Sequence, residues 1–158
     1  MREVEQDEHS TFSTFFNLFN LRHLLNCKNA TWRQHMSSIL VLDDVMDAGV
    51  MIKRILERKG HSVTVFTEEQ EALDHLRDHG VDIAILDIKL KKISGVEVLK
   101  EMKSSSPQTD VLMLTGYPTL ETAREALSLG AREYLVKPID KAELESKIET
   151  ILKERESS

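Results

Sequence analysis

The sequence predicts an α/β domain with a parallel β-sheet covered by helices, beginning after residue 37. From Ser38 onward, short apolar runs alternate with longer segments of helical period, which is the pattern of βα units. All six glycines and all three prolines also lie beyond residue 37, where the turns and helix ends of such a domain need them. With 158 residues, the chain can form one core of ordinary size but not two full domains.

Five apolar runs supply the predicted strands. Three of them, at residues 39–42, 83–86 and 111–114, show no polar alternation, which is typical of strands that helices cover on both faces. The run at 63–66 contains a threonine and is expected at an edge of the sheet. The fifth predicted strand is residues 134–136.

Five helices are predicted between and after these strands. Residues 67–70 and 94–97 each place a hydroxyl three residues before a Glu or Gln, so each can close a capping box at a helix start. Asp140 leads a similar motif, and we interpret Asp47 as the cap of the first helix. Glycine is typical of left-handed caps at helix ends. Three glycines are placed to end helices: Gly60, Gly80 and Gly130.

Residues 1–37 are a different kind of sequence, and we treat them as an N-terminal extension to the domain at 38–158. They hold all four asparagines of the chain and carry no net charge. Three interpretations stay open: an amphipathic helix that docks on a membrane or partner, a disordered extension, and a segment foreign to the native protein. The third rests on Met36, which stands where the domain begins. A membrane span and a signal peptide are not expected, because polar residues interrupt the apolar stretch and acidic residues precede it.

The charge of the chain excludes several classes of protein. The whole net charge of −6 lies in residues 38–158, and an acidic domain without a long basic run repels a nucleic acid backbone. Direct binding to nucleic acid is therefore not expected. Cys27 is the single cysteine, so a disulfide within the chain and a cysteine-based metal site are excluded. A reducing, cytoplasmic location fits this composition.

Polar side chains follow four of the five predicted strands. They are Asp43 and Asp44 after the first strand, Asp87 after the third, Thr115 after the fourth and Lys137 after the fifth. In an open parallel sheet, the carboxyl ends of the strands meet at one edge, so these side chains are expected to converge. Three carboxylates at one place repel one another, and oxygen ligands without His or Cys favour Mg²⁺ as the compensating cation.

The same residues could carry out phosphoryl transfer. A carboxylate can attack phosphorus and form an acyl phosphate. Lys137 would neutralise a phosphoryl oxygen and Thr115 would donate a hydroxyl hydrogen bond, while Mg²⁺ would spread the charge of the transfer. Because these residues form a set at the strand ends, they favour a functional site over isolated helix caps.

Four short motifs carry a resemblance to a known family. They are Leu42-Asp43-Asp44, Leu86-Asp87, Leu114-Thr115-Gly116-Tyr117 and Tyr134-Leu135-Val136-Lys137-Pro138. On these motifs, the stretch from residue 38 to about residue 153 resembles the receiver domain of two-component response regulators. The resemblance implies a flavodoxin-like, doubly wound fold, in which a five-stranded parallel sheet of order 2-1-3-4-5 is flanked by five helices.

The resemblance also implies roles for the acidic residues. Asp87 would accept a phosphoryl group from a histidine of a sensor histidine kinase or of a histidine phosphotransfer protein. Asp43, Asp44 and Asp87 would bind Mg²⁺, with the backbone carbonyl of Lys89 as a further ligand. The protein would then be no enzyme but a phosphoacceptor switch that assists its own phosphorylation and dephosphorylation.

Further residues match the switch of that family. Thr115 and Lys137 match the switch hydroxyl and the phosphate-binding lysine, and Tyr134 matches the aromatic residue that changes rotamer. The peptide bond before Pro138 is expected to be cis. Phosphorylation would pull Thr115 toward the phosphoryl oxygen, let Tyr134 turn inward and alter the face formed by residues 118–152.

One departure from the family concerns the loop after Asp87. Receivers usually carry proline four residues after the phosphoacceptor, whereas this chain has Lys91 there, within the basic run Lys89-Leu90-Lys91-Lys92. The sequence therefore leaves the shape of this loop open. The side chain of Lys89 could reach the phosphoryl group and block the attacking water, which predicts a longer-lived acyl phosphate than in a Lys89→Ala variant.

Two functions of different classes are compatible with these residues. The first is the phosphoryl-switched receiver, which the intact set of acidic residues, Thr115 and Lys137 favours. The second is a receiver-like interaction module whose partner binding does not depend on phosphate. Other α/β classes fail on specific residues, since Asp43-Asp44-Val45 lacks the Asp-x-Asp of haloacid-dehalogenase phosphatases and the glycine loops that bind nucleotides are missing.

The expected output is a change in protein binding. Because the chain ends after the fifth predicted helix, we expect it to act through a downstream protein that binds at residues 118–152. The same face could mediate a transient homodimer.

Overall fold

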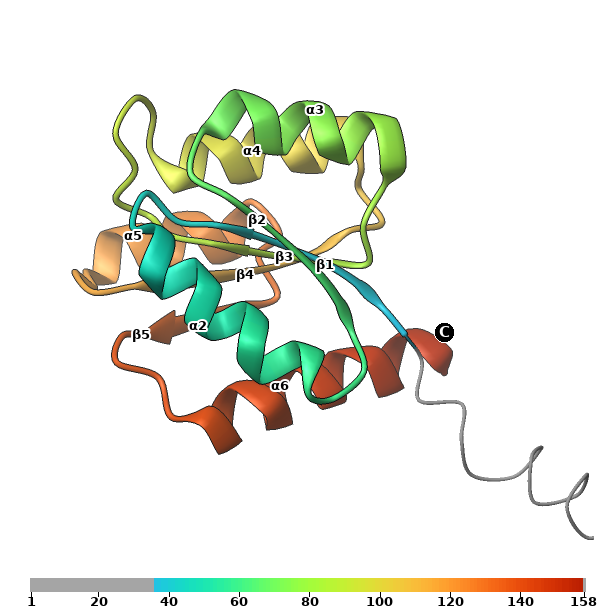
Figure 1. Ribbon diagram of the computed structural model, residues 1–158. Helices are drawn as coiled ribbons and strands as arrows, with labels where there is room; N and C mark the ends of the chain where they lie inside the picture. The colour runs from blue at the N-terminus through green and yellow to red at the C-terminus, as the bar shows by residue number, and fades with distance from the viewer. Residues whose placement is uncertain (1–35, 158) are drawn as a thin grey trace, which may run out of the picture. The chain divides into compact units, whose positions relative to one another are not determined.

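The structure, a computed structural model, describes residues 36–157. Within this range, five strands and five helices alternate along the chain (Figure 1). They are β1 (Ser38–Leu42), α2 (Met46–Glu57), β2 (Ser62–Phe66), α3 (Glu69–His79), β3 (Ile83–Leu86), α4 (Gly95–Ser105), β4 (Asp110–Thr115), α5 (Leu120–Ser128), β5 (Glu133–Val136) and α6 (Lys141–Glu156). None of these helices has both the length and the apolar character to cross a membrane. Residues 1–35 lie outside the described residues, so the three interpretations of the extension stay predictions.

The five strands form one parallel sheet in the order β2-β1-β3-β4-β5. This order confirms the doubly wound, flavodoxin-like fold, with β2 at an edge as predicted. Each predicted strand agrees with the observed one to within one residue at either end. In the middle of the sheet, Val41 of β1 is paired with Val65 on one side and with Ile85 on the other. The carboxyl ends of β1 and β3 are therefore neighbours, which brings together the residues that follow them.

Helices cover both faces of the sheet (Figure 1). On one face, α2 and α6 enclose an apolar core to which β1 contributes Ile39 and Val41. On the other face, α3, α4 and α5 enclose a second core, to which β1 contributes Leu40 and Leu42. Successive side chains of a strand point to opposite faces, so a strand covered on both sides is apolar throughout. The absence of polar alternation in this strand has that physical cause.

The helix ends confirm several predicted caps. Ser94 and Glu97 close a capping box at the start of α4, with both hydrogen bonds present. The Asp140 carboxylate accepts two backbone N–H groups in the first turn of α6. The glycines predicted to end helices all have positive φ angles, at 88° for Gly60, 64° for Gly80 and 93° for Gly130. Only glycine adopts this conformation without strain, so these residues stop the helices.

Two predicted helix caps do not form. The capping box expected at residues 67–70 does not form, because α3 begins at Glu69, whose carboxylate is buried against a distant loop. Asp47 lies inside the first turn of α2 and does not cap it. The turn before α2 is held instead by Asp43, whose Oδ1 accepts the backbone N–H of Val45 at 2.9 Å. At both helix starts, a carboxylate binds a backbone N–H outside the helix in place of the predicted cap.

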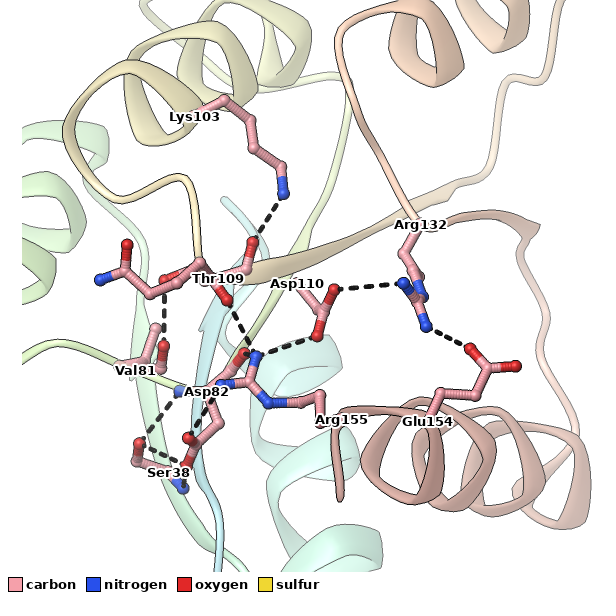
Figure 2. A network of polar contacts seen from close by, with 10 residues as sticks. Ser38, Val81, Asp82, Lys103, Thr109, Asp110, Arg132, Glu154 and Arg155 are labelled. Atoms are coloured by element: carbon pink, nitrogen blue, oxygen red, sulfur yellow. Dashed lines mark hydrogen bonds and ion pairs between the residues drawn. The ribbon is translucent and has the colours of Figure 1, made fainter. Parts of the chain in front are cut away.

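At the amino end of the sheet, a network of charged side chains ties α6 to three strands (Figure 2). Arg155 donates to the backbone oxygens of Asp82 and Gln108 at 3.0 and 2.9 Å, and to the carboxylate of Asp110 at 2.9 Å. The carboxylate of Asp82 accepts the backbone N–H of Ser38, the first residue of β1, at 2.8 Å. This network fixes the end of the last helix against the beginnings of β1, β3 and β4.

Candidate functional site

Three aspartates meet at the carboxyl end of the sheet. Asp43 and Asp44 follow β1 and Asp87 follows β3, and one carboxylate oxygen from each lies within 4.8 Å of the other two. Asp43 and Asp87 are 2% and 8% exposed, and Asp44 is half-buried. The structure thus brings together the three carboxylates that the sequence singled out. Because buried carboxylates at this distance repel one another, the cluster needs positive charge.

Lys137 supplies one positive charge to this acidic cluster. Its Nζ lies 2.5 Å from Asp43 Oδ2 and 3.1 Å from Asp87 Oδ2. Burial acts to lower the pKa of Lys137, but the hydrogen bonds and charges of the two aspartates outweigh it, so the pKa is raised. The lysine is therefore fully charged at neutral pH. Three carboxylates and one ammonium leave the cluster with two formal negative charges.

Backbone groups hold two of the carboxylates in place. Asp43 Oδ1 accepts the N–H of Val45 at 2.9 Å, and Asp87 Oδ1 accepts the N–H of Lys89 at 3.3 Å. Both bonds run from a side chain to the backbone two residues later, which is the Asx-turn geometry that aspartate favours after a strand. One oxygen of each carboxylate is thereby fixed, and the other faces Lys137.

Gly95, the first residue of α4, lets this helix approach the backbone of Asp87. A Cβ atom at Gly95 would lie 2.0 Å from the backbone oxygen of Asp87 and 2.9 Å from the Cα of Ile88. No side chain fits at these distances, so the position requires glycine. The N–H of Gly95 donates to the backbone oxygen of Ile88 at 2.9 Å. The start of α4 therefore fixes the backbone that carries the Asp87 carboxylate.

Thr115 ends β4 next to the segment that carries Lys137. The backbone N–H of Lys137 donates to the backbone oxygen of Thr115 at 2.8 Å, and Thr115 is fully buried. Its hydroxyl oxygen accepts the N–H of Tyr117 at 3.1 Å, which leaves the hydroxyl proton for a second partner. The Lys137–Pro138 peptide bond is cis.

Tyr134 is linked to α5 rather than to the acidic cluster. It lies on β5 and is half-buried, with its ring against the core beneath α3, α4 and α5. Its phenolic oxygen lies 2.9 Å from the hydroxyl oxygen of Thr122, in the first half of α5. A change in the position of Tyr134 would therefore reach the surface of α5 directly.

The side chain of Lys89 lies over an aromatic ring. Its Nζ is 4.3 Å from the ring centroid of Tyr117, two residues after Thr115, which is a cation–π contact. Both side chains are exposed. Lys89 meets the acidic cluster through its backbone N–H, and the metal-binding role of its carbonyl stays a prediction.

Glu69, a buried carboxylate near the same loop, was not predicted from the sequence. Glu69 is 4% exposed and accepts the backbone N–H of Lys92 at 3.1 Å. One signal was available, because Glu69 lies four residues before Leu73 and seven before Leu76, on the buried face of α3. An acidic residue in the first turn of a helix is normally interpreted as exposed, since it interacts well with the helix dipole there.

The acidic cluster fits a hard divalent cation such as Mg²⁺. All of its potential ligands are carboxylate oxygens, and Mg²⁺ prefers oxygen to nitrogen or sulfur. The two uncompensated negative charges match the charge of such an ion. Asp44 is the most exposed of the three aspartates, so a path from solvent to the cluster exists.

Comparison with known proteins places these features in a family. The family model described as the response regulator receiver domain matches residues 39–149. The transcriptional regulatory proteins ZraR and CpxR of Escherichia coli are 34% and 36% identical to this chain over 114 and 118 residues, or 72% and 75% of its length. The matched stretches make up 26% and 50% of those two proteins, so this chain spans a quarter to a half of the length of these relatives.

A solved structure agrees with the same assignment. The crystal structure of a response regulator receiver domain protein (CheY-like) from Methanospirillum hungatei aligns with a TM-score of 0.75 and 32% sequence identity. The alignment covers 77% of this chain and 98% of that chain.

Proposed function

The chain belongs to the response regulator receiver domain family, and from this membership we propose that it is a phosphoryl-switched receiver. Asp87 accepts a phosphoryl group from a histidine of a sensor histidine kinase or a histidine phosphotransfer protein, with Mg²⁺ bound at the acidic cluster. The phosphorylated form then binds a downstream protein differently from the unphosphorylated form.

The charge of the acidic cluster is the observation that supports this function most. Asp43 and Asp87 are buried beside Asp44, and Lys137 offsets only one of the three charges. Such an imbalance costs stability in the free protein, because each buried charge without a partner is unfavourable. The uncompensated negative charge is suited to bind a cation that in turn binds a phosphoryl group. A surface that only binds proteins does not require such a cluster.

The chemistry follows from the position of Asp87. A carboxylate oxygen of Asp87 attacks the phosphorus of a phosphohistidine, and the new P–O bond forms as the P–N bond breaks. The histidine nitrogen leaves with the electron pair of that bond and takes a proton from solvent. The bonds from Lys89 N–H to Oδ1 and from Lys137 to Oδ2 orient the carboxylate for this attack. Lys137 then neutralises a phosphoryl oxygen as a point charge.

The other site residues assist this transfer. Asp43, Asp44 and Asp87, with the backbone carbonyl of Lys89, are the groups that hold Mg²⁺, which supplies positive charge against the phosphoryl oxygens when bound. The hydroxyl of Thr115 donates a hydrogen bond to a phosphoryl oxygen. The phosphoryl group ends on the protein itself, so the protein is a switch that assists its own phosphorylation and dephosphorylation rather than an enzyme with a separate substrate.

The signal reaches the surface through Tyr134. When Thr115 moves toward the phosphoryl oxygen, Tyr134 turns inward and its 2.9 Å hydrogen bond to Thr122 of α5 breaks. The face of residues 118–152, which includes α5, β5 and most of α6, therefore changes between two states. A downstream protein binds this face, and a transient homodimer can form through it.

Phosphorylation by a small donor tests the function directly. The full chain is incubated with Mg²⁺ and acetyl phosphate, and its intact mass is measured beside that of Asp87→Asn and of Asp140→Asn. We expect one added phosphoryl group on the native protein and on Asp140→Asn, since Asp140 only caps α6. Asp87→Asn should gain none, and removal of Mg²⁺ with EDTA should prevent the gain in the native protein and in Asp140→Asn. A native protein that gains no phosphoryl group would contradict the proposal and favour the phosphate-independent interaction module.

A further inference from the structure

The loop between Asp87 and α4, residues 88–94, carries the backbone that faces the acidic cluster. Lys91 occupies the position where receivers usually have proline, so the backbone here lacks the restriction that a proline ring imposes. The loop also holds three lysines, whose like charges repel one another. The bond from the Gly95 N–H to the Ile88 oxygen closes the base of this loop, and the lysine-rich residues between need a further contact to hold their shape.

A buried carboxylate from another part of the chain contacts this loop. Glu69, the first residue of α3, is 4% exposed, and its Oε1 accepts the backbone N–H of Lys92 at 3.1 Å. Burial acts to raise the pKa of Glu69, but hydrogen bonds from its own backbone N–H and from those of Lys92 and Ile93 outweigh it and lower the pKa. The carboxylate is therefore ionised at neutral pH, and it is hydrogen-bonded to the loop at Lys92.

A second, exposed contact joins the same two segments. The side chain of Lys92 forms an ion pair with Glu68, directly before Glu69, and this lysine side chain is 70% exposed. Exposed ion pairs contribute little to stability, whereas a buried charged hydrogen bond contributes more. Glu68 is therefore a natural control for Glu69, because it has the same charge and touches the same loop residue.

The loop is anchored at both of its ends. At its beginning, the N–H of Lys89 donates to the Asp87 carboxylate, and at its end the Glu69 carboxylate binds Lys92. Only Leu90 and Lys91 lie between these anchors, and the Leu90 side chain packs partly buried against the core. With both anchors in place, the backbone of Lys89 has little freedom relative to Asp87.

We propose that Glu69 is a positioning residue for the phosphoacceptor loop: its buried carboxylate holds residues 88–94 in the shape that Asp87 and the Lys89 backbone need, in the absence of the usual proline. This inference rests on the proposed function, because it assigns Glu69 a role toward Mg²⁺ binding and phosphoryl transfer. It also predicts a local effect, the protection of the Lys92 amide from exchange, that does not depend on that function.

Three single variants of the full chain separate this role from general stability. In Glu69→Ala, amide hydrogen exchange measured by NMR should accelerate about tenfold or more at Lys92, since its N–H loses a charged hydrogen-bond acceptor. The dissociation constant for Mg²⁺, measured by calorimetry, should rise about tenfold, as is common when a group that supports metal ligands is removed. Glu69→Gln keeps a carbonyl oxygen as acceptor and should recover most of both losses. Glu68→Ala should change neither quantity by more than about twofold.

The outcomes distinguish the inference from the proposed function. The thermal midpoint of each variant is also measured. A lowered midpoint would reveal a loss of global stability, which speeds exchange throughout the chain and not only in the loop. Unchanged exchange at Lys92 in Glu69→Ala would overturn the positioning role. An unchanged Mg²⁺ affinity together with faster exchange at Lys92 would overturn it too. Equal losses in Glu68→Ala and Glu69→Ala would overturn it as well. If the native protein itself bound no Mg²⁺ and gained no phosphoryl group, the proposed function would fail, and the exchange data alone would still decide whether Glu69 anchors the loop.

Discussion

Charged side chains cluster at both ends of the β-sheet, but the ratio of acidic to basic groups differs between the two ends. At the amino end, acidic and basic groups are equal in number (Figure 2). The groups are Asp82, Asp110 and Glu154 on one side and Lys103, Arg132 and Arg155 on the other. At the carboxyl end, three aspartates share the single ammonium of Lys137.

The charged groups at the amino end stabilise the fold, whereas those at the carboxyl end are suited to bind a ligand. Arg155 at the amino end contacts two backbone oxygens and two carboxylates, so its charge is fully used within the protein. At the carboxyl end, the described residues leave two negative charges uncompensated, and this cost is maintained in the free protein. Variants at the carboxyl end should therefore change Mg²⁺ binding, whereas variants at the amino end should leave it unchanged.

The largest effect is expected for removal of Lys137. Lys137→Met leaves two buried carboxylates without their cation, so the free energy of unfolding in EDTA should fall by about 3 kcal/mol. Urea denaturation measures this loss. Adding Asp87→Asn in the same chain should recover most of it, because the repulsion then involves one charge fewer. A Lys137→Met variant as stable as the native protein in EDTA would show that the cluster is not strained.

A smaller loss is expected at the amino end. Arg155→Ala removes charged hydrogen bonds to the backbone of Asp82 and Gln108 and to the Asp110 carboxylate, and should lower the free energy of unfolding by about 2 kcal/mol. Its affinity for Mg²⁺ should equal that of the native protein.

Arg132 provides the matched control at this end. Arg132→Ala removes an exposed side chain that pairs with Asp110 and Glu154, so it should cost about 0.5 kcal/mol or less. A weakened Mg²⁺ affinity in Arg155→Ala would contradict the independence of the two ends.

The contribution of Lys137 should depend on pH. Because its pKa is raised in the folded protein, the protonated lysine stabilises the fold, and this stabilisation is fully present below the ordinary pKa of 10.5. It is lost as the pH rises through the raised value. The stability difference between the native protein and Lys137→Met should therefore be constant from about pH 8 to about pH 10 and shrink above that range. For Lys59→Met, which removes an exposed lysine, the difference should stay small throughout. If the stability difference between the native protein and Lys137→Met stayed constant up to about pH 11, this would contradict the proposed contribution of the charged lysine.

A further small effect concerns the lifetime of the acyl phosphate. Lys89→Ala should shorten it by about threefold, or about 0.7 kcal/mol in the barrier, because the exposed ammonium over Tyr117 no longer hinders the attacking water. The decay of phosphorylated protein after removal of the donor measures this, with Lys91→Ala as the control. Equal or slower decay in Lys89→Ala would exclude a protective role for this side chain.

The fold was largely predictable because its determinants are local. Apolar runs without polar alternation placed the strands to within one residue, and Gly60, Gly80 and Gly130 marked helix ends through their own backbone preference. The helix starts at α2 and α3 were not predictable in the same way. They depend on Asp43 and Glu69, whose carboxylates bind backbone groups outside the helices they precede or begin.

The residues of the candidate site could be predicted from the sequence, but the residues that hold the surrounding backbone in place could not. Asp43, Asp44 and Asp87 follow strands whose ends must meet in a parallel sheet, so topology alone brings them together. Glu69 and Arg155 were missed, because each acts on a backbone group 23 or 73 residues away and neither belongs to a motif.

The sequence by itself determined the class of fold, the strand positions and the set of carboxylates at one edge of the sheet. These features follow from the period of apolar residues and from the residue types at the strand ends, which are properties of neighbouring positions. Only the tertiary structure decided how the charges are paired: Lys137 with Asp43 and Asp87, Glu69 with the loop at Lys92, and Arg155 with the beginnings of the strands. Pairing depends on distance in space and on burial, and a sequence specifies both only after the chain has folded.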